Sequence, residues 1–545
     1  MTNTLHDGRW NLNRFRAYAP PMRTQRSRLA LLAAGGATLT TLLLAPAGQA
    51  ATADRSFSAT VVVDKQAAES TGEPSIDVAK DGTIYVVAPD GAGARVPNAI
   101  GGGAGSGGSL IWRSSDKGAT WSFRGSFDVP TGGGDTDIVS SPDGTLFASG
   151  LSYAACSTLA VSKDRGDTFV PVPVAGCGQI PLSNDREWNA VDGNSTVFTV
   201  IGDTVNTAID LIRSSVVSSL TIPSQTIKLS TTADYQWPGT VAVDPRNGRT
   251  YTVWNTAGDP NDCDDTKCKA PASSTTPDRI LVSILPRGGT TPPTPVVVAS
   301  RRFDTFDSFV SNAIDASGTT YVVWSERHPA SNETWSMLSA SRDGGAHWTA
   351  PVKVNRSPHT TTFPWVTAGA DGRIAVSYYG TAATGTSPQR VAKTAPWYVY
   401  SAFSTDGGRT FAEYRTSGVM DKGQICTSGT GCSSGGRNLL DFFETTTDAH
   451  GCLLTAFTDN SSGTPYVSFV RQQSGPGLLA TPCTRPASTG APASVVHQRP
   501  VTARNTGGAT GGGGGLASTG LPVGLAWCGL LLLALTLRTR SRSRT

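Results

Sequence analysis

Charged residues are scarce in this sequence: they make up 16% of its 545 positions, and only six histidines occur. Two of the histidines, His6 and His497, lie outside the central part of the chain, and no motif marks a histidine-based triad among the others. The sequence also has no phosphate-binding loop, no zinc-binding helix motif and no Gly-x-Ser-x-Gly elbow. Nucleotide, zinc-protease and α/β-hydrolase chemistry are therefore without support.

A surplus of basic residues is also lacking in the central part of the chain. The formal net charge is +4, but residues 1–50 hold six Arg against one Asp, and residues 538–545 hold four Arg. Without these ends, 35 basic residues face 40 acidic ones, a net charge of −5. Nucleic-acid binders need Lys and Arg to neutralise phosphates, so we expect no nucleic-acid partner.

Glycine is abundant, with 61 residues, and apolar residues make up 38% of the chain. The glycine content is too high for a helical protein, and the apolar content is too high for a wholly disordered one. The length exceeds that of one typical domain, so the chain must contain either several domains or a large repeat.

The N-terminal end has the form of a secretory signal peptide over residues 1–53. Arg23 to Arg28 is a positive segment, Leu29 to Leu44 is an apolar run, and Ala51-Thr-Ala53 gives the small-residue cleavage pattern. Because the leader has no twin arginine, we expect the general secretory route. The alternative is a signal anchor that stays in place.

The C-terminal end, residues 516–545, has three parts. Leu516-Ala-Ser-Thr-Gly520 is followed by an apolar run to Leu537 and an Arg-rich tail. This arrangement resembles the Leu-Ala-x-Thr-Gly sorting signals cut by sortases of high-GC Gram-positive bacteria. The resemblance implies a sortase partner, cleavage between Thr519 and Gly520, and attachment to the cell wall; the alternative is a single-pass membrane anchor. Residues 484–515 form a flexible spacer rich in small residues.

Cysteine usage agrees with export, because eight cysteines lie between the two signals and an even number in an oxidising compartment indicates disulfides. They are Cys156, Cys177, Cys263, Cys268, Cys426, Cys432, Cys452 and Cys483. Eight cysteines allow 105 pairings, so the sequence does not fix them. Short separations favour Cys263–Cys268 and Cys426–Cys432.

Residues 54–483 form a repeat. An apolar strand, a tight turn with Asp or Asn and Gly, and a second strand rich in aromatic or β-branched residues recur seven times, as in Val243-Asp-Pro-Arg-Asn-Gly248-Arg-Thr-Tyr-Thr-Val-Trp. Asp or Asn with Gly suits the positive φ of a hairpin turn. The repeat therefore predicts an all-β chain of antiparallel hairpins.

A second motif follows four of these hairpins. Its copies are Ser114-Ser-Asp116-Lys-Gly118-Ala-Thr120-Trp121, Ser162-Lys-Asp164-Arg-Gly166-Asp-Thr168-Phe169, Ser341-Arg-Asp343-Gly-Gly345-Ala-His-Trp348 and Ser404-Thr-Asp406-Gly-Gly408-Arg-Thr410-Phe411. This resembles the Asp-box (BNR repeat) of sialidase-like β-propellers; the third copy departs from it by His347. Its Asp is expected to accept backbone N–H bonds within the turn and its aromatic to pack between sheets, which is a structural role.

The spacing of the boxes predicts the number of blades. Asp164 and Asp343 lie 179 residues apart, which fits three blade lengths with two decayed boxes. The last blade lacks a fourth strand, and Ala59-Thr-Val-Val-Val-Asp64 is free to supply it and close the ring. We expect a β-propeller of seven blades, with the six of typical sialidases as the alternative.

Strand order puts the hairpin turns and Asp-boxes on one face, and the second-to-third and fourth-to-first loops on the other. Cys156 and Cys177 fall on this second face, where a disulfide between them is reasonable. Segments that lead into first strands bring Glu73, Asp135, Asp137, Asp185-Arg186-Glu187-Trp188, Trp237, Asp307, Trp365 and Asp441-Phe-Phe-Glu444 to the same face. Ends of second strands bring Trp254, Glu326-Arg327, Tyr378-Tyr379 and Asp459. Aromatic rings beside carboxylates suit sugars, although the same residues also serve as core and turn caps.

The family resemblance implies three arginines on a substrate carboxylate, a Tyr nucleophile paired with Glu, and an Asp acid/base. The family's first arginine lies in a Phe/Tyr-Arg-Ile-Pro motif, but the matching stretch, Gly72-Glu-Pro-Ser-Ile76, has none. This counts against sialidase activity. The remaining candidates are assigned by residue type alone: Arg186, Arg302, Arg327 and Arg437, Tyr378 or Tyr379 with Glu326 or Glu444, and the acids Asp185 and Glu187.

An acidic loop offers a metal site as an alternative to having no cofactor. Asp259, Asp262, Asp264 and Asp265 are oxygen donors of the kind that bind Ca²⁺, but they lack EF-hand spacing. We expect an exported, monomeric propeller that binds an extracellular glycan or surface protein without turnover. The alternatives are a glycoside hydrolase, of sialidase type or another, and a scaffold for protein partners.

Overall fold

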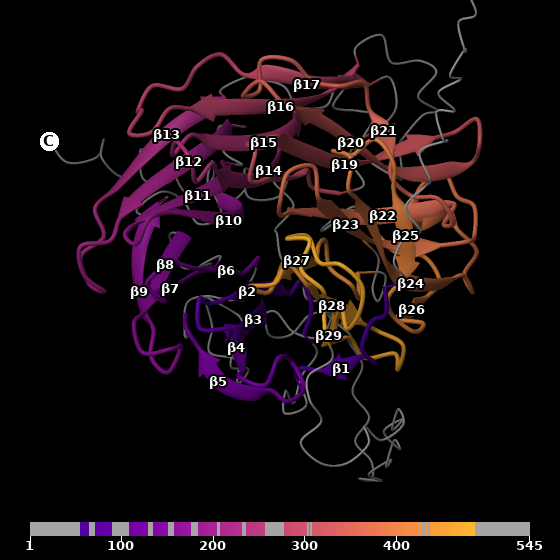
Figure 1. Ribbon diagram of the computed structural model, residues 1–545, viewed down its shortest axis with the longest axis horizontal. Helices are drawn as coiled ribbons and strands as arrows, with labels where there is room; N and C mark the ends of the chain where they lie inside the picture. Colours follow the sequence, from indigo (N-terminus) through magenta and orange to yellow (C-terminus); the bar gives the residue numbers. More distant parts are fainter. Residues whose placement is uncertain are drawn as a thin grey trace, which may run out of the picture. The chain divides into compact units, whose positions relative to one another are not determined.

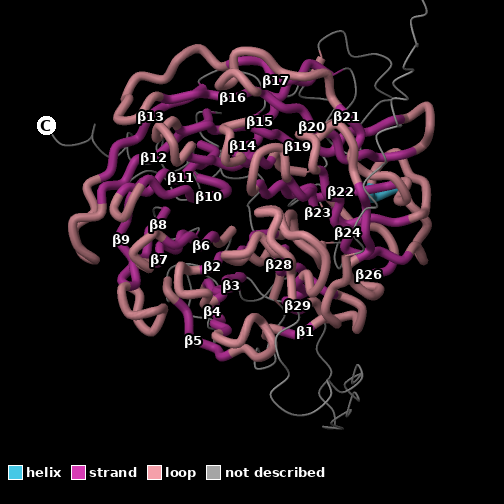
Figure 2. Tube along the Cα trace, viewed as in Figure 1, coloured by secondary structure: helices cyan, strands magenta, loops and turns pink. Residues whose placement is uncertain are grey.

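The computed structural model describes residues 55–64, 71–89, 108–128, 135–150, 157–175, 184–203, 208–230, 236–256, 277–301, 305, 308–427, 432 and 437–484. The regular structure of these residues is β-strand, apart from one short 3-10 helix, η2 (Pro388–Arg390). In this part of the chain no helix has the length and apolar character needed to cross a membrane. The all-β prediction is therefore confirmed (Figure 2).

Four sheets are each built from four consecutive antiparallel strands, as expected for propeller blades. They are β2 (Ser75–Val78), β3 (Ile84–Pro89), β4 (Ser109–Ser114) and β5 (Ser122–Ser126); β6 (Asp137–Ser140), β7 (Leu146–Gly150), β8 (Ser157–Ser162) and β9 (Val170–Ala175); β10 (Asn184–Asp192), β11 (Thr196–Asp203), β12 (Ala208–Ser215) and β13 (Ser224–Ser230); β14 (Gln236–Val243), β15 (Thr250–Thr256), β16 (Asp278–Leu285) and β17 (Val296–Arg301).

A fifth four-stranded sheet joins the two ends of the described chain. It contains β27 (Glu444–Thr447), β28 (Leu453–Asp459) and β29 (Tyr466–Arg471), and its outer strand is the N-terminal β1 (Val61–Val62). Val61 pairs with Phe469 and Val62 with Ser468. The prediction that residues 59–64 supply the missing fourth strand is confirmed.

The remaining strands form one sheet of nine: β18 (Ser311–Ile314), β19 (Thr320–His328), β20 (Glu333–Ser341), β21 (Val352–Lys353), β22 (Thr360–Ala368), β23 (Ile374–Thr381), β24 (Pro396–Ser404), β25 (Ala412–Arg415) and β26 (Asp421–Lys422). Two antiparallel halves, β18–β21 and β22–β26, meet in a single parallel pair between Thr334 and Thr360.

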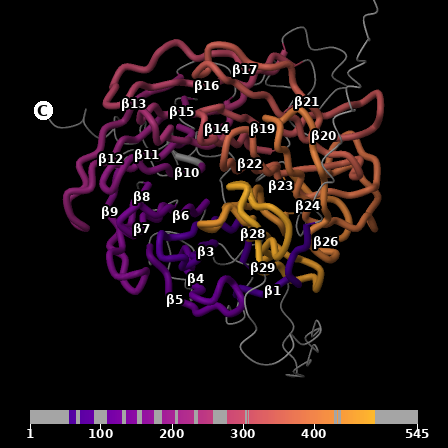
Figure 3. The backbone as a smooth tube through the Cα atoms, in the orientation of Figure 1, coloured from indigo at the N-terminus to yellow at the C-terminus, as the bar shows by residue number. Residues whose placement is uncertain are grey.

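The innermost strand of each of the six sheets, and β22 from the second half of the nine-stranded sheet, lie at the centre (Figure 1). Each contacts the next, in the order β2, β6, β10, β14, β18, β22 and β27, and β27 contacts β2 again. Following the chain from indigo to yellow leads once around this ring, until the last strands lie beside the first (Figure 3). The described chain is therefore a β-propeller.

The sheets are held together by apolar side chains packed between neighbours. One such cluster joins β27–β29 to the β2–β5 sheet through Val86, Trp112, Leu454 and Phe469. The Asp-box aromatics take part: Trp121 lies edge-on to Phe469, with ring centroids 5.2 Å apart. The predicted packing role of the box aromatic is thus seen between neighbouring sheets.

The Asp-boxes fold as predicted. In the first box, Asp116 accepts hydrogen bonds from the backbone N and the Oγ1 of Thr120, at 2.9 and 2.5 Å. Ser114 Oγ donates to Asp116 and accepts from the N of Gly118. The same bonds recur at Asp164, Asp343 and Asp406, with the His347 ring replacing the threonine hydroxyl in the third box. The motif aspartates Asp116, Asp164, Asp343 and Asp406 are thus each bonded within their own turn.

The box glycine also has a packing role, which Gly118→Ala should reveal. Gly118 has φ +85°, and a Cβ built there would lie 2.1 Å from the Phe469 ring. Gly82 has nearly the same φ, +84°, with nothing within 4 Å. Gly82→Ala should cost about 1–2 kcal/mol through backbone strain alone, and Gly118→Ala about 1–3 kcal/mol more through overpacking. Unfolding midpoints in denaturant test this. Equal losses in the two variants would show that a Cβ at position 118 fits beside the Phe469 ring without overpacking.

Two disulfides occur in the described residues. Cys426–Cys432 was predicted and is confirmed, while Cys452–Cys483 spans 31 residues. Cys156, Cys177, Cys263 and Cys268 all lie outside the described residues, so the other two favoured pairs are not tested. Residues 1–53 and the sorting signal lie outside the described residues as well.

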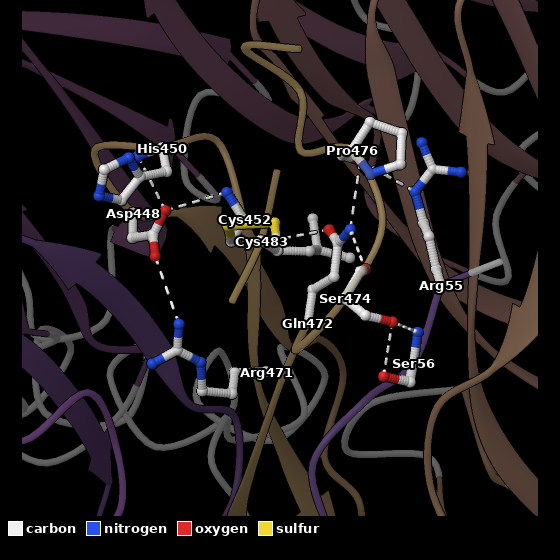
Figure 4. Close-up of a disulfide and its surroundings, with 11 residues drawn as sticks. Arg55, Ser56, Asp448, His450, Cys452, Arg471, Gln472, Ser474, Pro476 and Cys483 are labelled. Carbon is white, nitrogen blue, oxygen red and sulfur yellow. Dashed lines mark hydrogen bonds and ion pairs between the residues drawn. A yellow bond between two sulfur atoms is a disulfide. The ribbon is translucent and has the colours of Figure 1, made fainter. Parts of the chain in front are cut away.

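The second disulfide fastens a C-terminal strap, residues 475–484, to the hairpin turn between β27 and β28 (Figure 4). The N-terminal segment lies beside the strap: Arg55 Nε donates to the Pro476 carbonyl at 3.1 Å, and Ser56 Oγ lies 2.7 Å from Ser474 Oγ. The strap also reaches the turn between β22 and β23, where Ala370 N donates to the Leu478 carbonyl. Both ends of the described chain therefore lie on the face that carries the hairpin turns and Asp-boxes, here called the box face.

Candidate functional site

The opposite face, here called the loop face, is where the first strands begin, and the backbone there repeats an unusual conformation. Non-glycine residues with positive φ precede or interrupt five first strands: Glu73 (48°), Asp135 (43°), Arg186 (67°), Phe363 (54°) and Leu440 (57°) belong to the segments of β2, β6, β10, β22 and β27. The pairing register of β10 and β22 shifts at these residues. Such bulges redirect side chains, here at the beginning of strands that surround the axis.

Four of these segments, those of β2, β6, β10 and β27, supply a buried charged group, here called the arginine cluster: Glu73, Asp135, Arg186, Arg437 and Asp441. Arg186 Nη1 lies 3.0 Å from Glu73 Oε1 and 2.7 Å from Asp135 Oδ1, and its Nη2 is paired with Asp441 Oδ2. Arg437 pairs with Asp441 as well, and the backbone N of Asp441 donates to Glu73 Oε1 at 2.9 Å. Two guanidinium groups therefore hold three carboxylates from different sheets.

The pKa values of Glu73 and Asp441 are shifted in opposite directions. Removal from water raises the pKa of Glu73 to about 8, although Arg186 opposes the change. Burial also acts on Asp441, but the charges of Arg437 and Arg186 outweigh it and hold the pKa of Asp441 below its usual value. Near pH 7 Glu73 is therefore largely protonated, whereas Asp441 is ionised.

Aromatic side chains fill the rest of the axis at this end. The axial aromatic cluster consists of Trp188, Trp237, Phe309, Trp365 and Phe442, which belong to the segments of five consecutive first strands. Trp188 is at its centre, with ring centroids 5.2 Å from Phe309, 5.4 Å from Phe442 and 6.3 Å from Trp365. The guanidinium carbon of Arg186 lies 4.4 Å from the centroid of Phe309, so the two clusters touch. Trp188 is fully buried, but Trp237 and Trp365 are only partly buried.

Below the arginine cluster lies a second polar layer made by Ser75, Asp137, Asn189 and Glu444. Each first strand here offers a side-chain oxygen to the backbone of the next strand in the ring. Glu444 Oε2 accepts from Ile76 N at 3.2 Å, Ser75 Oγ from Ile138 N at 3.2 Å, and Asp137 Oδ2 from Asn189 N at 2.6 Å. The layer therefore links β27, β2, β6 and β10 around the axis.

Several predicted site residues lie elsewhere. Glu326 is fully buried in β19, where it pairs with Arg301 and accepts from the Trp324 ring nitrogen at 3.1 Å. Arg327, next in the strand, is also buried. Burial raises the pKa of Glu326, but the bonds from His328 and Arg301 outweigh this and leave it below its usual value. Glu326 is thus an ionised, internally paired carboxylate.

The predicted tyrosine–glutamate pair does not form. Tyr378 and Tyr379 are both fully buried and, as neighbours in β23, point to opposite sides of the sheet. The Tyr378 hydroxyl donates to Glu413, while the Tyr379 hydroxyl accepts from Thr458 N at 3.0 Å and its ring stacks on Phe443. Neither is brought to Glu326 or Glu444, because both rings serve as core between sheets.

Of the remaining predicted residues, Arg186, Arg437 and Glu444 belong to the two axial layers, and Glu187 is buried beside them in β10. Asp185 lies at the start of β10, but its side chain is not described. The other predicted residues lie outside the described residues altogether: Arg302, Asp307 and the acidic loop of Asp259, Asp262, Asp264 and Asp265. In the part that is described, no three His, Cys, Asp or Glu side chains are arranged to hold a metal ion. Ser75 and Phe309 had no sequence signal that singled them out.

Comparisons of this chain with solved structures give matches of low sequence identity. No family model and no curated protein matches it. A Dyadobacter fermentans protein of unknown function has 13% identity and a TM-score of 0.42, covering 77% of this chain and 99% of its own. The Fusarium graminearum GH93 α-L-arabinofuranosidase with arabinobiose has 12% identity and a TM-score of 0.42, covering 76% and 97%. A Hadza microbial sialidase has 13% identity and a TM-score of 0.37, covering 73% and 65%.

Proposed function

We propose that this protein is an extracellular glycan-binding propeller, that its ligand is a neutral sugar chain, and that the ligand lies on the loop face against the axial aromatic cluster. The partly buried rings of Trp237 and Trp365 give flat apolar surfaces for sugar faces. Neighbouring carboxylates and backbone groups accept hydrogen bonds from hydroxyls. A few polar groups around an apolar, largely pre-formed surface are typical of small-ligand sites.

The observation that favours a neutral ligand is that Arg186 and Arg437 are both paired with acids of the protein itself. Arg186 is already paired with three carboxylates, and Arg437 shares one of them. A clamp for a sialic-acid carboxylate needs guanidinium groups whose charge is available to the substrate. Here both arginines are engaged by the protein's own acids, and the stretch Gly72–Ile76, which matches the first-blade sialidase motif, has no arginine.

Substitution of the two partly buried tryptophans, Trp237 and Trp365, tests this proposal. In Trp237→Ala and Trp365→Ala, we expect affinity for the bound glycan to fall at least about tenfold, because each ring supplies stacking surface. Glycan-array screening followed by calorimetry on the purified protein measures this. Trp121→Ala is the matched control, since Trp121 is also partly buried but lies on the box face; it should leave affinity unchanged.

The same protein should release no sialic acid from a fluorogenic sialoside, even at high protein concentration. Release that disappears in Arg186→Ala would overturn the proposal and assign Arg186 to a substrate clamp. Failure to bind any neutral glycan would equally contradict it.

A second candidate is a glycoside hydrolase acting on neutral glycans. It is favoured by the opposite pKa shifts of Glu73 and Asp441 in one cluster, since a protonated acid beside an ionised one is the pattern of paired catalytic carboxylates. Turnover of neutral aryl glycosides in the binding experiment distinguishes this candidate from binding alone.

We further propose that the chain is exported, cut between Thr519 and Gly520, and held at the cell wall. Both ends of the described chain leave from the box face, beside the strap. A tether attached there leaves the loop face directed away from the wall. For the ring itself we propose seven blades, because seven first strands contact one another in a closed cycle and the nine-stranded sheet divides at one residue pair.

A further inference from the structure

The second polar layer contains two carboxyl groups that share one hydroxyl. Ser75 Oγ lies 2.7 Å from Asp137 Oδ1 and 2.6 Å from Glu444 Oε2. All three residues are buried, with exposed fractions of 0% for Ser75, 3% for Asp137 and 4% for Glu444. Both distances are those of short O–H···O hydrogen bonds. Each contact therefore requires a proton between its two oxygens.

Counting donors shows that the serine cannot supply both protons. A serine hydroxyl has one hydrogen to donate and two lone pairs with which to accept. The backbone N of Ile138 donates to Ser75 Oγ and provides no proton for the carboxylates. If Asp137 and Glu444 were both ionised, one of the two contacts would be oxygen against oxygen with no hydrogen between them. One carboxyl group must therefore be protonated and donate to the serine.

The surroundings select Glu444 as the protonated group. Each acid accepts one backbone N–H: Asp137 from Asn189 at 2.6 Å through its second oxygen, and Glu444 from Ile76 at 3.2 Å through Oε2, the oxygen that already faces Ser75. The second oxygen of Glu444, Oε1, has no hydrogen-bond partner among the described residues. An ionised Glu444 would leave that oxygen charged, buried and unbonded, which is costly.

The charged groups that face Glu444 act in the same direction. Asp137 of β6 and Asp77 of β2 are both acidic, and together with burial they raise the pKa of Glu444 well above its usual value. Burial also raises the pKa of Asp137, but only to about 6, so near pH 7 this acid is ionised. The two arginines of the axis, Arg186 and Arg437, are engaged by Asp441 in the arginine cluster.

We propose that Glu444, Ser75 and Asp137 form a proton-binding site that joins β27, β2 and β6: Glu444 carries the proton and donates to Ser75, and Ser75 donates to Asp137. The site lies where the last sheet meets the first, so it couples closure of the ring to pH. A group whose pKa is higher in the folded than in the unfolded state gives stability that is present at low pH and lost as pH rises. Closure should therefore weaken with increasing pH.

Infrared spectroscopy of the full protein tests for the proton directly, through the C=O absorption of protonated carboxylic acids at pH 7. Glu444→Gln should remove the absorption of one buried acid. Glu73→Gln, the matched control, should remove a different one and leave that of Glu444. Unchanged absorption in Glu444→Gln would overturn the proposal.

Asp137→Asn keeps the test decisive if Glu444→Gln fails to fold. The asparagine amide donates to Ser75, so that Ser75 donates to Glu444 instead of accepting from it; the Glu444 C=O absorption should therefore shift in frequency. A Glu444 absorption unchanged from the wild type would contradict the proposed chain of donors. In parallel, the melting temperature of the wild type should fall between pH 6 and 9, and the fall should be shallower in Glu444→Gln. An equally steep fall in both would also contradict the coupling.

Discussion

Replacing Arg186 by methionine should cost about 3–5 kcal/mol of stability, the largest effect of any single charge in the protein. The methionine keeps an unbranched stem against Phe309, but the guanidinium that lies within 3.0 Å of Glu73 and Asp135 is lost. Three acids from separate sheets then remain buried beside Arg437 alone. The midpoint of urea unfolding at pH 7 measures the loss.

The loss should depend on pH in a defined direction. Without Arg186 the buried acids hold protons more strongly in the folded state, so the pKa of Asp441, now below its usual value, rises. Groups with raised folded-state pKa lose stability as pH rises. The deficit of Arg186→Met should therefore be larger at pH 8 than at pH 5.

Arg165→Ala is the control for this experiment. Arg165 lies 3.0 Å from Asp81, but the two side chains are 58% and 49% exposed. Exposed pairs contribute about 0–1 kcal/mol. If both substitutions lower the free energy of unfolding equally, burial does not strengthen the ion pairs of the arginine cluster. Arg186 would then not be the residue that stabilises the three buried acids.

Removing the Cys452–Cys483 disulfide should have the second largest effect, about 4 kcal/mol. In the chain-entropy account, a bond that closes a longer loop restricts the unfolded chain more, and this one spans 31 residues. The strap that it fastens also carries Leu478, which is buried against Phe403 and Leu453 of neighbouring sheets. The double substitution of both cysteines by serine, followed by guanidinium unfolding, measures the loss.

Cys426–Cys432 provides the matched comparison, because it spans only six residues. Its removal should cost about 2 kcal/mol by the same account. Limited proteolysis adds a second measurement: cleavage within residues 475–484 should become faster in the Cys452 and Cys483 variant and stay slow in the other. Equal unfolding midpoints for the two variants would argue against the strap as a closing element.

Much of the fold followed from local sequence. Asp and Gly at fixed offsets define the hairpins and the boxes. The bonds that make each turn join residues no more than four positions apart, as Ser114 with Asp116 and Asp116 with Thr120. The closing strand was also predictable, since residues 59–64 had β-branched residues and no partner in their own blade. Such features depend on short-range chemistry that a single chain displays directly.

The site was only partly predictable. The sequence identified the segments that meet on the loop face, including those of Glu73, Arg186 and Glu444, because strand order alone sends them there; Arg437 was chosen by residue type. It did not identify their partners: Arg186 meets acids 51, 113 and 255 positions away, and no local pattern encodes those pairs. Tyr378 and Tyr379 were chosen by residue type, and the alternation of β23 placed both rings between sheets instead.

The amino-acid sequence by itself determined that this chain is a β-propeller with Asp-boxes, and which of its faces carries the variable loops. Those properties come from turns and strands whose interactions are local. Only the tertiary structure decided that the two axial arginines are occupied by the protein's own acids, and that Ser75 lies between two buried carboxyl groups. Closing the ring brings the beginnings of distant strands into one dry space, and the charges and protons found there depend on which side chains that closure places in contact.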